Sequence, residues 1–88
     1  MVYAVITYDV DVSRVNKVKK FLRLYLQWIQ NSVLEGELTK AELLEVKVGI
    51  RDIIEEDVDS IFIFTTKDKK YLNKEIIGIE KAPTDQII

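Results

Sequence analysis

The sequence predicts one α+β domain in which two helices pack on one side of a sheet. Two apolar, β-branched runs, residues 2–8 and 60–66, have the composition of buried strands. The longer segments between them repeat apolar residues at the spacing of amphipathic helices. A chain of 88 residues with a hydrophobic fraction of 48% can bury one core, so we expect a single domain over residues 1–88.

The first apolar run is followed by a helix. Residues 2–8 are nearly free of charge, which predicts a strand buried on both faces. Asp11 and Ser13 are both candidate N-caps for a helix that covers residues 14–25. Its apolar positions predict a buried stripe made of Val15, Val18, Phe21, Leu22 and Tyr25. The basic residues cannot share that stripe and fall on the exposed side: Lys17, Lys20 and Arg23.

The middle of the chain predicts a hairpin and a second helix. Residues 27–38 form two short apolar stretches around the polar turn Asn31-Ser32. The segment from Thr39 to Glu42 has the pattern of a capping box, which starts a helix that runs to about Ile54. Residues 46–51 alternate like a strand and contain a glycine, but the explicit cap and the apolar spacing favour a helix.

The last third predicts two further strands. Residues 60–66 form a second apolar strand, in which we expect Phe62 and Phe64 to pack in the core. Residues 75–79 form a weaker strand, and the tail after it ends in two isoleucines. Because an apolar tail on a small domain is suited to strand addition, we expect residues 75–88 to dock on a partner subunit.

This order, β-α-β-β-α-β with an extra C-terminal strand, predicts a ferredoxin-like α+β sandwich. Right-handed crossovers place both helices on one side of an antiparallel sheet. The other face of the sheet is then left open and apolar. Two such faces packed together would cover each other, so we expect a homodimer.

The composition excludes several kinds of chemistry. The chain has no cysteine and no histidine, which rules out disulfides, thiol catalysis and an imidazole base. No stretch reaches the roughly 20 apolar residues of a membrane span, and no signal-peptide pattern opens the chain. We therefore expect a cytoplasmic protein without membrane contact.

The charges are segregated, although the net charge is only -2. The charged residues between positions 35 and 59 are mostly acidic, whereas those of the first helix and of residues 67–74 are mostly basic. The acid-free stretch in the first helix contains Arg14, Lys17, Lys19, Lys20 and Arg23. This stretch is either a solvated helix face or a surface that contacts phosphates, because binding responds to local potential rather than to net charge.

Asp9, at the end of the first strand, is the first candidate for a metal-binding or catalytic residue. A carboxylate there is held where the backbone leaves the sheet, a common place for metal ligands. The alternative is a turn residue that helps Asp11 or Ser13 to start the helix. Mg²⁺ needs few protein ligands, so one Asp9, or a pair of them in a dimer, would hold an ion that activates water against a phosphodiester.

Three groups of aromatic residues allow structural and functional interpretations. Tyr8 lies on the opposite strand face from Asp9, which favours a core aromatic over a role in stacking or proton transfer. Phe62 and Phe64 share a strand face, as the stacking aromatics of RNA-binding sheets do, but their apolar run favours core packing. Trp28 is a core, interface or base-stacking residue, and the sequence leaves these three interpretations open.

Several motifs of the chain occur together at a definite spacing. The first strand ends in Tyr8-Asp9-Val10 and is followed by the basic helix. Residues 30–38 contain the pattern Gln-x-Ser-Val-x-Glu-Gly-x-Leu, and Asp59 begins the strand Asp-Ser-Ile-Phe-Ile. Together, at this spacing, these motifs are fairly specific, and with them the chain resembles the Cas2 family of small CRISPR-associated proteins over nearly its whole length.

The resemblance implies a ferredoxin-like homodimer in which the last strand of each subunit joins the sheet of its partner. It implies metal-dependent cleavage of single-stranded RNA or double-stranded DNA, and a place at the non-catalytic centre of the CRISPR integrase complex that captures spacers. Asp9 is then the Mg²⁺-associated catalytic residue. Tyr8 corresponds to the preceding aromatic residue of the family, and Ser32 to the serine of the Gln-x-Ser stretch.

Two positions depart from the family pattern. Trp28 stands where members usually have arginine, and Leu34 stands where they usually have phenylalanine. Loss of the arginine removes a bidentate phosphate donor, so the architectural role is better preserved than cleavage.

The leading hypothesis is a CRISPR adaptation protein, a nucleic-acid-binding homodimer with Mg²⁺-dependent endonuclease activity at Asp9. Its expected partners are DNA or RNA and a CRISPR integrase subunit, and its expected phosphate contacts are Arg14, Lys17, Lys20 and Arg23. The alternative is a ferredoxin-like dimeric module that regulates or binds a small molecule without touching nucleic acid. An RNA-cleaving toxin of similar fold is a third interpretation.

Overall fold

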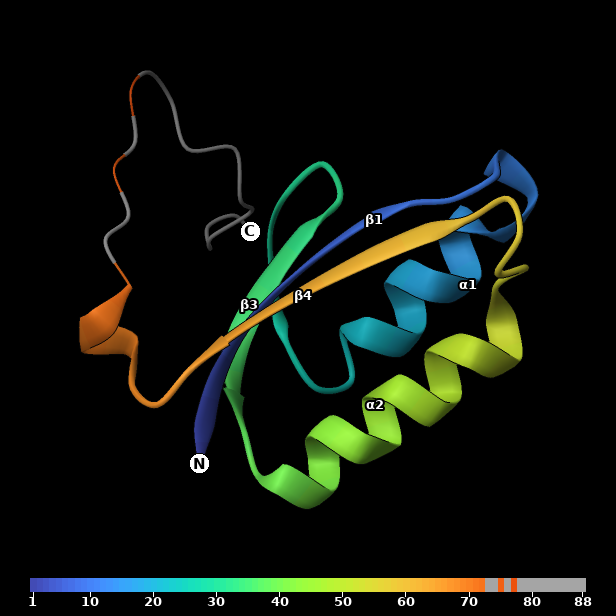
Figure 1. Ribbon diagram of the computed structural model, residues 1–88. Coiled ribbons are helices and arrows are strands. Elements are labelled where there is room, and N and C mark those ends of the chain that lie inside the picture. The colour runs from blue at the N-terminus through green and yellow to red at the C-terminus, as the bar shows by residue number, and fades with distance from the viewer. Residues whose placement is uncertain (73–74, 76, 78–88) are drawn as a thin grey trace.

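The computed structural model describes residues 1–72, 75 and 77 (Figure 1). In order, these residues form β1 (Val2–Asp9), α1 (Val12–Leu22), β2 (Gln27–Gln30), β3 (Val33–Leu38), α2 (Lys40–Ile53), β4 (Ser60–Thr66) and the 3₁₀ helix η1 (Lys69–Tyr71). The four strands form one sheet in the order β2-β3-β1-β4, with every neighbouring pair antiparallel. Neither helix in this part of the chain has the length and apolar composition needed to cross a bilayer.

The sheet is built from two split β-α-β units. β1 and β2 run parallel because both are antiparallel to β3, and β3 and β4 run parallel because both are antiparallel to β1. The helices α1 and α2 make the two crossovers and pack on the same side of the sheet (Figure 1). This arrangement confirms the ferredoxin-like α+β fold. The predicted extra strand and tail, residues 75–88, lie outside the described residues except for the isolated positions 75 and 77.

The core lies between the sheet and the two helices. Ala4, Ile6 and Tyr8 alternate along β1 with less buried residues, as expected for a strand that turns one face to the helices. The rest of the buried cluster comes from the helices, the segment after α1 and β3: Val18, Leu22, Leu26, Leu34, Leu38, Val46 and Ile50. Leu34, one of the two positions that depart from the family pattern, is therefore a fully buried core residue.

Both helices begin at side-chain caps. Asp11 is the N-cap of α1, and its carboxylate accepts hydrogen bonds from the backbone N–H of Ser13 at 3.0 Å and from the Ser13 hydroxyl at 2.6 Å. Thr39 and Glu42 form the predicted capping box of α2, with reciprocal bonds of 3.0 and 2.8 Å. The helical interpretation of residues 46–51 is thereby confirmed over the strand alternative.

Helix α1 ends earlier than predicted, at Leu22 instead of Tyr25. The chain turns there because Leu26 has to be buried against β3, where its side chain is 6% exposed. Gly36 makes room for it, since a Cβ atom at that position would lie 3.2 Å from Leu26 Cδ2. A helix continued to Tyr25 would carry Leu26 away from this place.

The two apolar strands are each buried mainly on one face. Phe62 and Phe64 lie on the open face of the sheet, opposite Thr7 and Val5 of β1 in the register, and each is 57% exposed. The prediction that the two phenylalanines pack in the core was therefore wrong for the single chain. The prediction that β1 is buried on both faces holds for Tyr3 but not for Val5 and Thr7, which are half-buried. Both helices lie on one side of the sheet, so the apolar composition of the strands led to too much burial being predicted for the opposite face.

Candidate functional site

Asp9 occupies the last position of β1, where its side chain is exposed. It is paired in the register with Ser60, the first residue of β4. It also lines a shallow depression of about 310 Å³ together with Tyr8, Val10, Val15, Asn31 and Ser32. The structure therefore brings together three of the predicted site residues, Tyr8, Asp9 and Ser32.

The turn between β2 and β3 forms one wall of this depression. Asn31 has a positive φ of 45°, a conformation that asparagine tolerates better than most residues. The Trp28 indole N–H donates to the Asn31 carbonyl at 2.9 Å, and the Tyr8 backbone N–H donates to the Ser32 carbonyl at 3.1 Å. The first bond braces the turn itself, and the second ties the turn to the end of β1 and keeps Ser32 beside Asp9.

Trp28 has a structural role in the single chain. Its ring packs against the hydrophobic core, and Lys19 Nζ lies 4.9 Å from the ring centroid. Its indole N–H is used by the turn, as described above. Of the three interpretations of Trp28, the contacts support the core residue.

Tyr8 is a core residue that also lines the depression. It is 8% exposed and belongs to the hydrophobic cluster, as its position on the helix-facing side of β1 predicts. Burial raises the pKa of its hydroxyl, so the phenol stays neutral at physiological pH. Tyr8 therefore supports the strand end that carries Asp9 rather than acting as a base.

The donor set at Asp9 fits a lightly held divalent cation. Asp9 is the one carboxylate among the residues that line the depression, and the described part of the chain contains no cluster of three or more Asp, Glu, His or Cys side chains placed to hold a metal. Mg²⁺ keeps several waters and is often bound through one or two carboxylates and substrate phosphates. One chain thus offers a single carboxylate here, and a second copy or a phosphate would have to add further ligands to hold an ion.

The four predicted phosphate contacts fall into two groups. Lys17, Lys20 and Arg23 are exposed at a spacing of three residues along α1, and none of them lines the depression at Asp9. Arg14 is different, because its side chain is only 19% exposed and is paired with Asp59. Arg14 Nε and Nη2 donate to the two carboxylate oxygens of Asp59 at 2.6 and 3.0 Å.

Asp59 is an important residue that the sequence did not single out for chemistry. Its side chain is 1% exposed, and it also accepts hydrogen bonds from the backbone N–H groups of Asp11 at 3.0 Å and Glu55 at 2.9 Å. The Arg14 guanidinium, more than any other group, holds the pKa of Asp59 well below its usual range. The one signal in the sequence is its place directly before an apolar strand.

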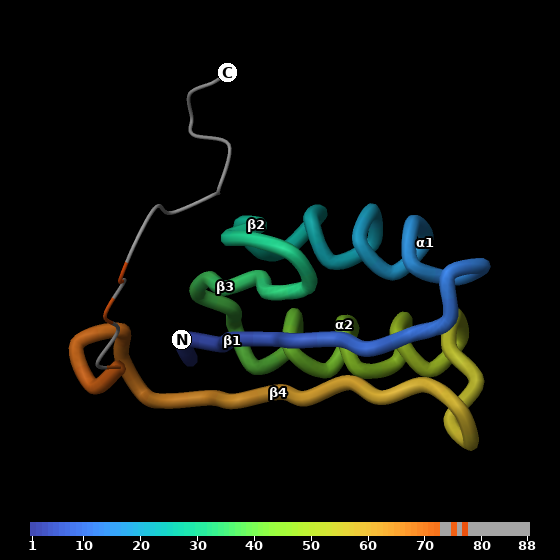
Figure 2. The backbone as a smooth tube through the Cα atoms, turned by 90° about the horizontal axis from the view of Figure 1, so that it is seen from above, coloured from blue at the N-terminus to red at the C-terminus, as the bar shows by residue number. Residues whose placement is uncertain are grey.

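Away from Asp9, a separate group of polar residues surrounds Tyr3 of β1. Tyr3 is 5% exposed, and burial raises its pKa to about 12, with a further contribution from a hydrogen bond to Glu35. Lys69 Nζ, in η1, lies 5.9 Å from the Tyr3 ring centroid. Figure 2 shows η1 beyond the end of β4 and close to the start of β1, at the opposite end of the sheet from Asp9.

These features define a class of small ferredoxin-like proteins that present a single carboxylate at the exposed end of the first strand and leave one sheet face uncovered. The family described as CRISPR associated protein Cas2 matches residues 1–74. The chain belongs to this family.

Individual proteins of the family are similar over the whole chain. A protein of Methanosarcina acetivorans named CRISPR-associated endoribonuclease Cas2 is 54% identical over 86 residues, which cover 98% of this chain and 99% of that protein. A crystal structure of a Cas2 protein superposes with a TM-score of 0.85 at 44% identity, covering 99% and 98% of the two chains. Streptococcus pyogenes Cas2, solved at pH 6.5, gives a TM-score of 0.75 at 32% identity over 86% of this chain and 99% of that one.

Proposed function

We propose that this chain is a CRISPR adaptation protein that binds nucleic acid as a homodimer and cleaves phosphodiester bonds with Mg²⁺ at Asp9. The observation that carries the proposal is the exposed carboxylate of Asp9 in a depression at the strand end of a Cas2 family member. Relatives that share about half of the sequence are named endoribonucleases, which supports nuclease activity. The alternative of a regulatory module without nucleic-acid contact has no comparable support.

At the proposed active site, each residue has a separate task. Asp9 and water would hold the ion, which when bound supplies positive charge to the phosphate and lowers the pKa of a water molecule. The half-buried Ser32 has a hydroxyl that would donate a hydrogen bond to a phosphate oxygen. Tyr8 and the β2–β3 turn hold both residues in place through the Tyr8 N–H bond to Ser32.

The exposed basic residues of α1 would supply most of the binding energy for nucleic acid. Lys17, Lys20 and Arg23 recur every three residues, so they lie along one side of the helix and can follow a phosphate backbone. Such contacts release counterions and make binding strongly dependent on salt. They do not select a sequence, which suits a protein that handles many different fragments.

The homodimer is proposed from the uncovered part of the sheet. β4 is at the edge of the described sheet, and no charged residue or proline protects it between Ser60 and Thr66. On one side of β4, Phe62 and Phe64 form an exposed stacked pair with ring centroids 6.3 Å apart. A second copy would cover this apolar surface, and residues 75–88 of that copy would extend the sheet.

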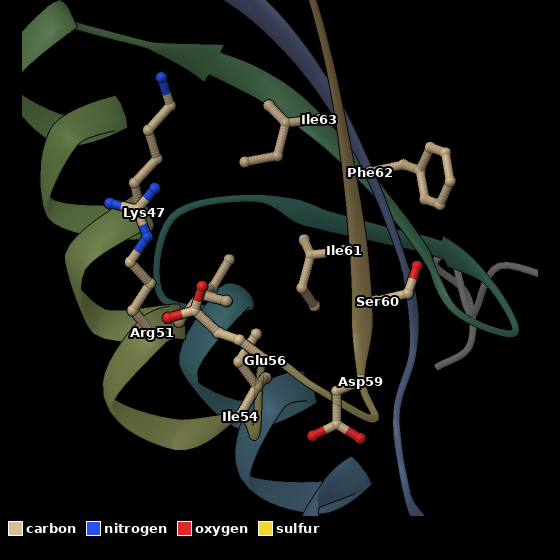
Figure 3. A pocket seen from close by; sticks show the side chains of 10 residues that line it. Lys47, Arg51, Ile54, Glu56, Asp59, Ser60, Ile61, Phe62 and Ile63 are labelled. Atoms are coloured by element: carbon tan, nitrogen blue, oxygen red, sulfur yellow. The ribbon is translucent and has the colours of Figure 1, made fainter.

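A groove lies on the other side of β4 from the exposed face of the sheet (Figure 3). It has a volume of about 520 Å³ and lies between α2 and β4. Ile61 and Ile63 point into it, whereas Phe62 points away.

We also propose that the dimer binds a CRISPR integrase subunit, as the family assignment suggests.

The experiment that tests the active site is the substitution Asp9→Ala. Because stabilisation of phosphate charge by a metal is worth several kcal/mol, Mg²⁺-dependent cleavage of labelled single-stranded RNA or duplex DNA should fall by about 100-fold or more. The melting temperature and the dimer should be retained, since Asp9 is exposed and belongs to no core cluster. Asp57→Ala, another exposed aspartate, is the matched control. Full activity of Asp9→Ala would refute the proposed active site.

A further inference from the structure

Arg14 is unsuited to the phosphate contact that its position in the basic helix predicts. The two nitrogens on one edge of its guanidinium, Nε and Nη2, donate to the carboxylate oxygens of Asp59 at 2.6 and 3.0 Å. Its third nitrogen, Nη1, lies 3.8 Å from a carboxylate oxygen of Glu55. A phosphate could take the Nε–Nη2 edge only by breaking a bidentate ion pair whose carboxylate is 1% exposed. Leaving that carboxylate buried without its arginine is strongly unfavourable. The rest of the guanidinium belongs to a side chain that is only 19% exposed and lies beside the Glu55 carboxylate, which repels an anion.

The carboxylate of Asp59 connects this pair to the loop that follows Asp9. Its Oδ1 accepts from the Asp11 backbone N–H at 3.0 Å, and its Oδ2 accepts from the Glu55 backbone N–H at 2.9 Å. With the two bonds from Arg14, each oxygen has two donors. Asp59 therefore ties the loop after β1 to the loop before β4 and to the first turns of α1.

Asp9 lies between two points that this network fixes. On one side it is paired with Ser60, the neighbour of Asp59 in sequence. Two residues further along, Asp11 is held by Asp59 directly. Figure 3 shows the Asp59 side chain at the start of β4, directed toward α1, at one end of the groove between α2 and β4 that it helps to line.

We propose that Arg14 and Asp59 are positioning residues that hold the turn of Asp9, and that Arg14 makes no contact with nucleic acid. This inference rests on the proposed function of Asp9. Groups that orient a metal ligand are typically worth about 10- to 100-fold in metal affinity. Arg14 and Asp59 would act on Asp9 through the backbone of its turn, so we expect a loss toward the lower end of this range.

The first test separates a positioning arginine from a phosphate contact. The affinity for a labelled DNA duplex is measured by fluorescence anisotropy over a range of salt concentrations for the wild type, Arg14→Gln and Lys17→Gln. A lost phosphate contact lowers the slope of log K against log salt by about 0.9. We expect this loss for Lys17→Gln and an unchanged slope for Arg14→Gln. A slope reduced equally in both variants would overturn the proposal.

The second test measures the turn itself. Mn²⁺ is titrated into the ¹⁵N-labelled protein, and paramagnetic broadening of the Asp9 and Val10 amide signals gives the apparent affinity. Asp59→Asn replaces one carboxylate oxygen by an NH2 group, which in either orientation faces a donor of Arg14 and the backbone N–H of Asp11 or Glu55. The network around Asp11 is then weakened, so the affinity should fall by about 10-fold or more. Arg14→Lys keeps the charge but not the bidentate geometry, so it should also weaken Mn²⁺ binding while keeping the salt slope.

A third measurement, the hydrogen exchange of the Asp11 amide, needs neither metal nor nucleic acid. Exchange should accelerate in Asp59→Asn and Arg14→Lys while the amides of the core strands stay protected. Glu55→Gln, which removes only the distant 3.8 Å partner, is the control that should change nothing. If the wild type binds neither Mn²⁺ nor DNA, the proposed function fails, and Asp11 exchange alone decides the positioning role. Wild-type protection of Asp11 in both variants would contradict it.

Discussion

At the scale of single residues, the two aspartates at the end of β1 and the start of β4 illustrate opposite uses of a carboxylate. Asp9 is exposed and lines a depression, so its oxygens are accessible to a ligand. Asp59 is buried and receives four hydrogen bonds, so its oxygens are saturated. The first arrangement suits metal binding, and the second suits a structural role in which the carboxylate holds neighbouring segments together.

Sequence reasoning could find Asp9 but not the role of Asp59. Asp9 is identified by a local pattern, the end of an apolar run. The partners of Asp59, Arg14 and Asp11, lie 45 and 48 residues away, and no periodicity in the chain indicates such a pairing. For the same reason Arg14 was grouped with the exposed cations of its helix, although its guanidinium is directed at Asp59.

The Arg14–Asp59 pair predicts how stability depends on pH. The folded-state pKa of Asp59 is depressed below its ordinary value of 3.8, so the ionised carboxylate stabilises the folded state fully above that value. This contribution is lost as the pH falls through the folded-state pKa. Asp59→Asn should lower Tm by more than about 5 °C at neutral pH, and the difference from the wild type should narrow below about pH 4. Thermal melts followed by circular dichroism test this, and a difference that stays constant down to about pH 2 would contradict it.

At the scale of elements, the order of strands and helices could be predicted because each depends on a local signal. The capping box of Thr39 and Glu42 and the apolar run of β4 fixed their elements within a residue or two. The end of α1 could not be predicted, because it depends on the docking of Leu26 beside Gly36. Tertiary packing overrides helix periodicity at that point.

Gly49, which made the helical interpretation of α2 uncertain, has a packing reason. A Cβ atom there would overlap with the ring of Phe21 in α1, so the glycine lets the two helices approach. Gly49→Ala should destabilise the fold by about 1 kcal/mol, because overpacking costs about 1–3 kcal/mol and helix propensity returns about 1 kcal/mol.

The same substitution should change sign when Phe21 is removed. In a Phe21→Ala background there is space for the methyl group, so Gly49→Ala should stabilise the variant by about 0.5–1 kcal/mol. Urea denaturation of the four proteins of this cycle provides the measurement. Stabilisation of similar size in both backgrounds would show that the Phe21 ring does not restrict position 49.

At the scale of the whole molecule, the topology of the sheet could be predicted from the sequence, but the exposure of residues on its open face could not. Right-handed crossovers and the order of elements leave one sheet face without helices. Whether Phe62 and Phe64 are buried depends on what covers that face, and a single sequence does not contain this information. Their 57% exposure in one chain is the strongest indication that the chain associates.

Association should therefore depend on these two rings. Burying the exposed parts of Phe62 and Phe64 is worth about 2–3 kcal/mol in each subunit. Both subunits of a homodimer carry the change, so the double variant Phe62→Ser/Phe64→Ser should raise the dimer Kd by about 1,000-fold or more. Sedimentation velocity over a concentration series measures this. Leu44→Gln, at a 62% exposed apolar position on α2, is the control that should leave the dimer intact. A dimer that is unaffected by the double variant would assign the interface to another surface.

The central claim, that this Cas2 family member binds nucleic acid through the exposed basic residues of α1, the helix that follows Asp9, is tested most directly by the salt dependence of binding. The affinity for a labelled duplex is measured between about 50 and 200 mM salt, for the wild type and for a variant in which Lys17, Lys20 and Arg23 are replaced by glutamine. We predict a steep loss of affinity with salt in the wild type, and a slope that is lower by about 0.9 for every phosphate contact removed. Absence of binding at the lowest salt concentration, or the same slope in both proteins, would contradict the account.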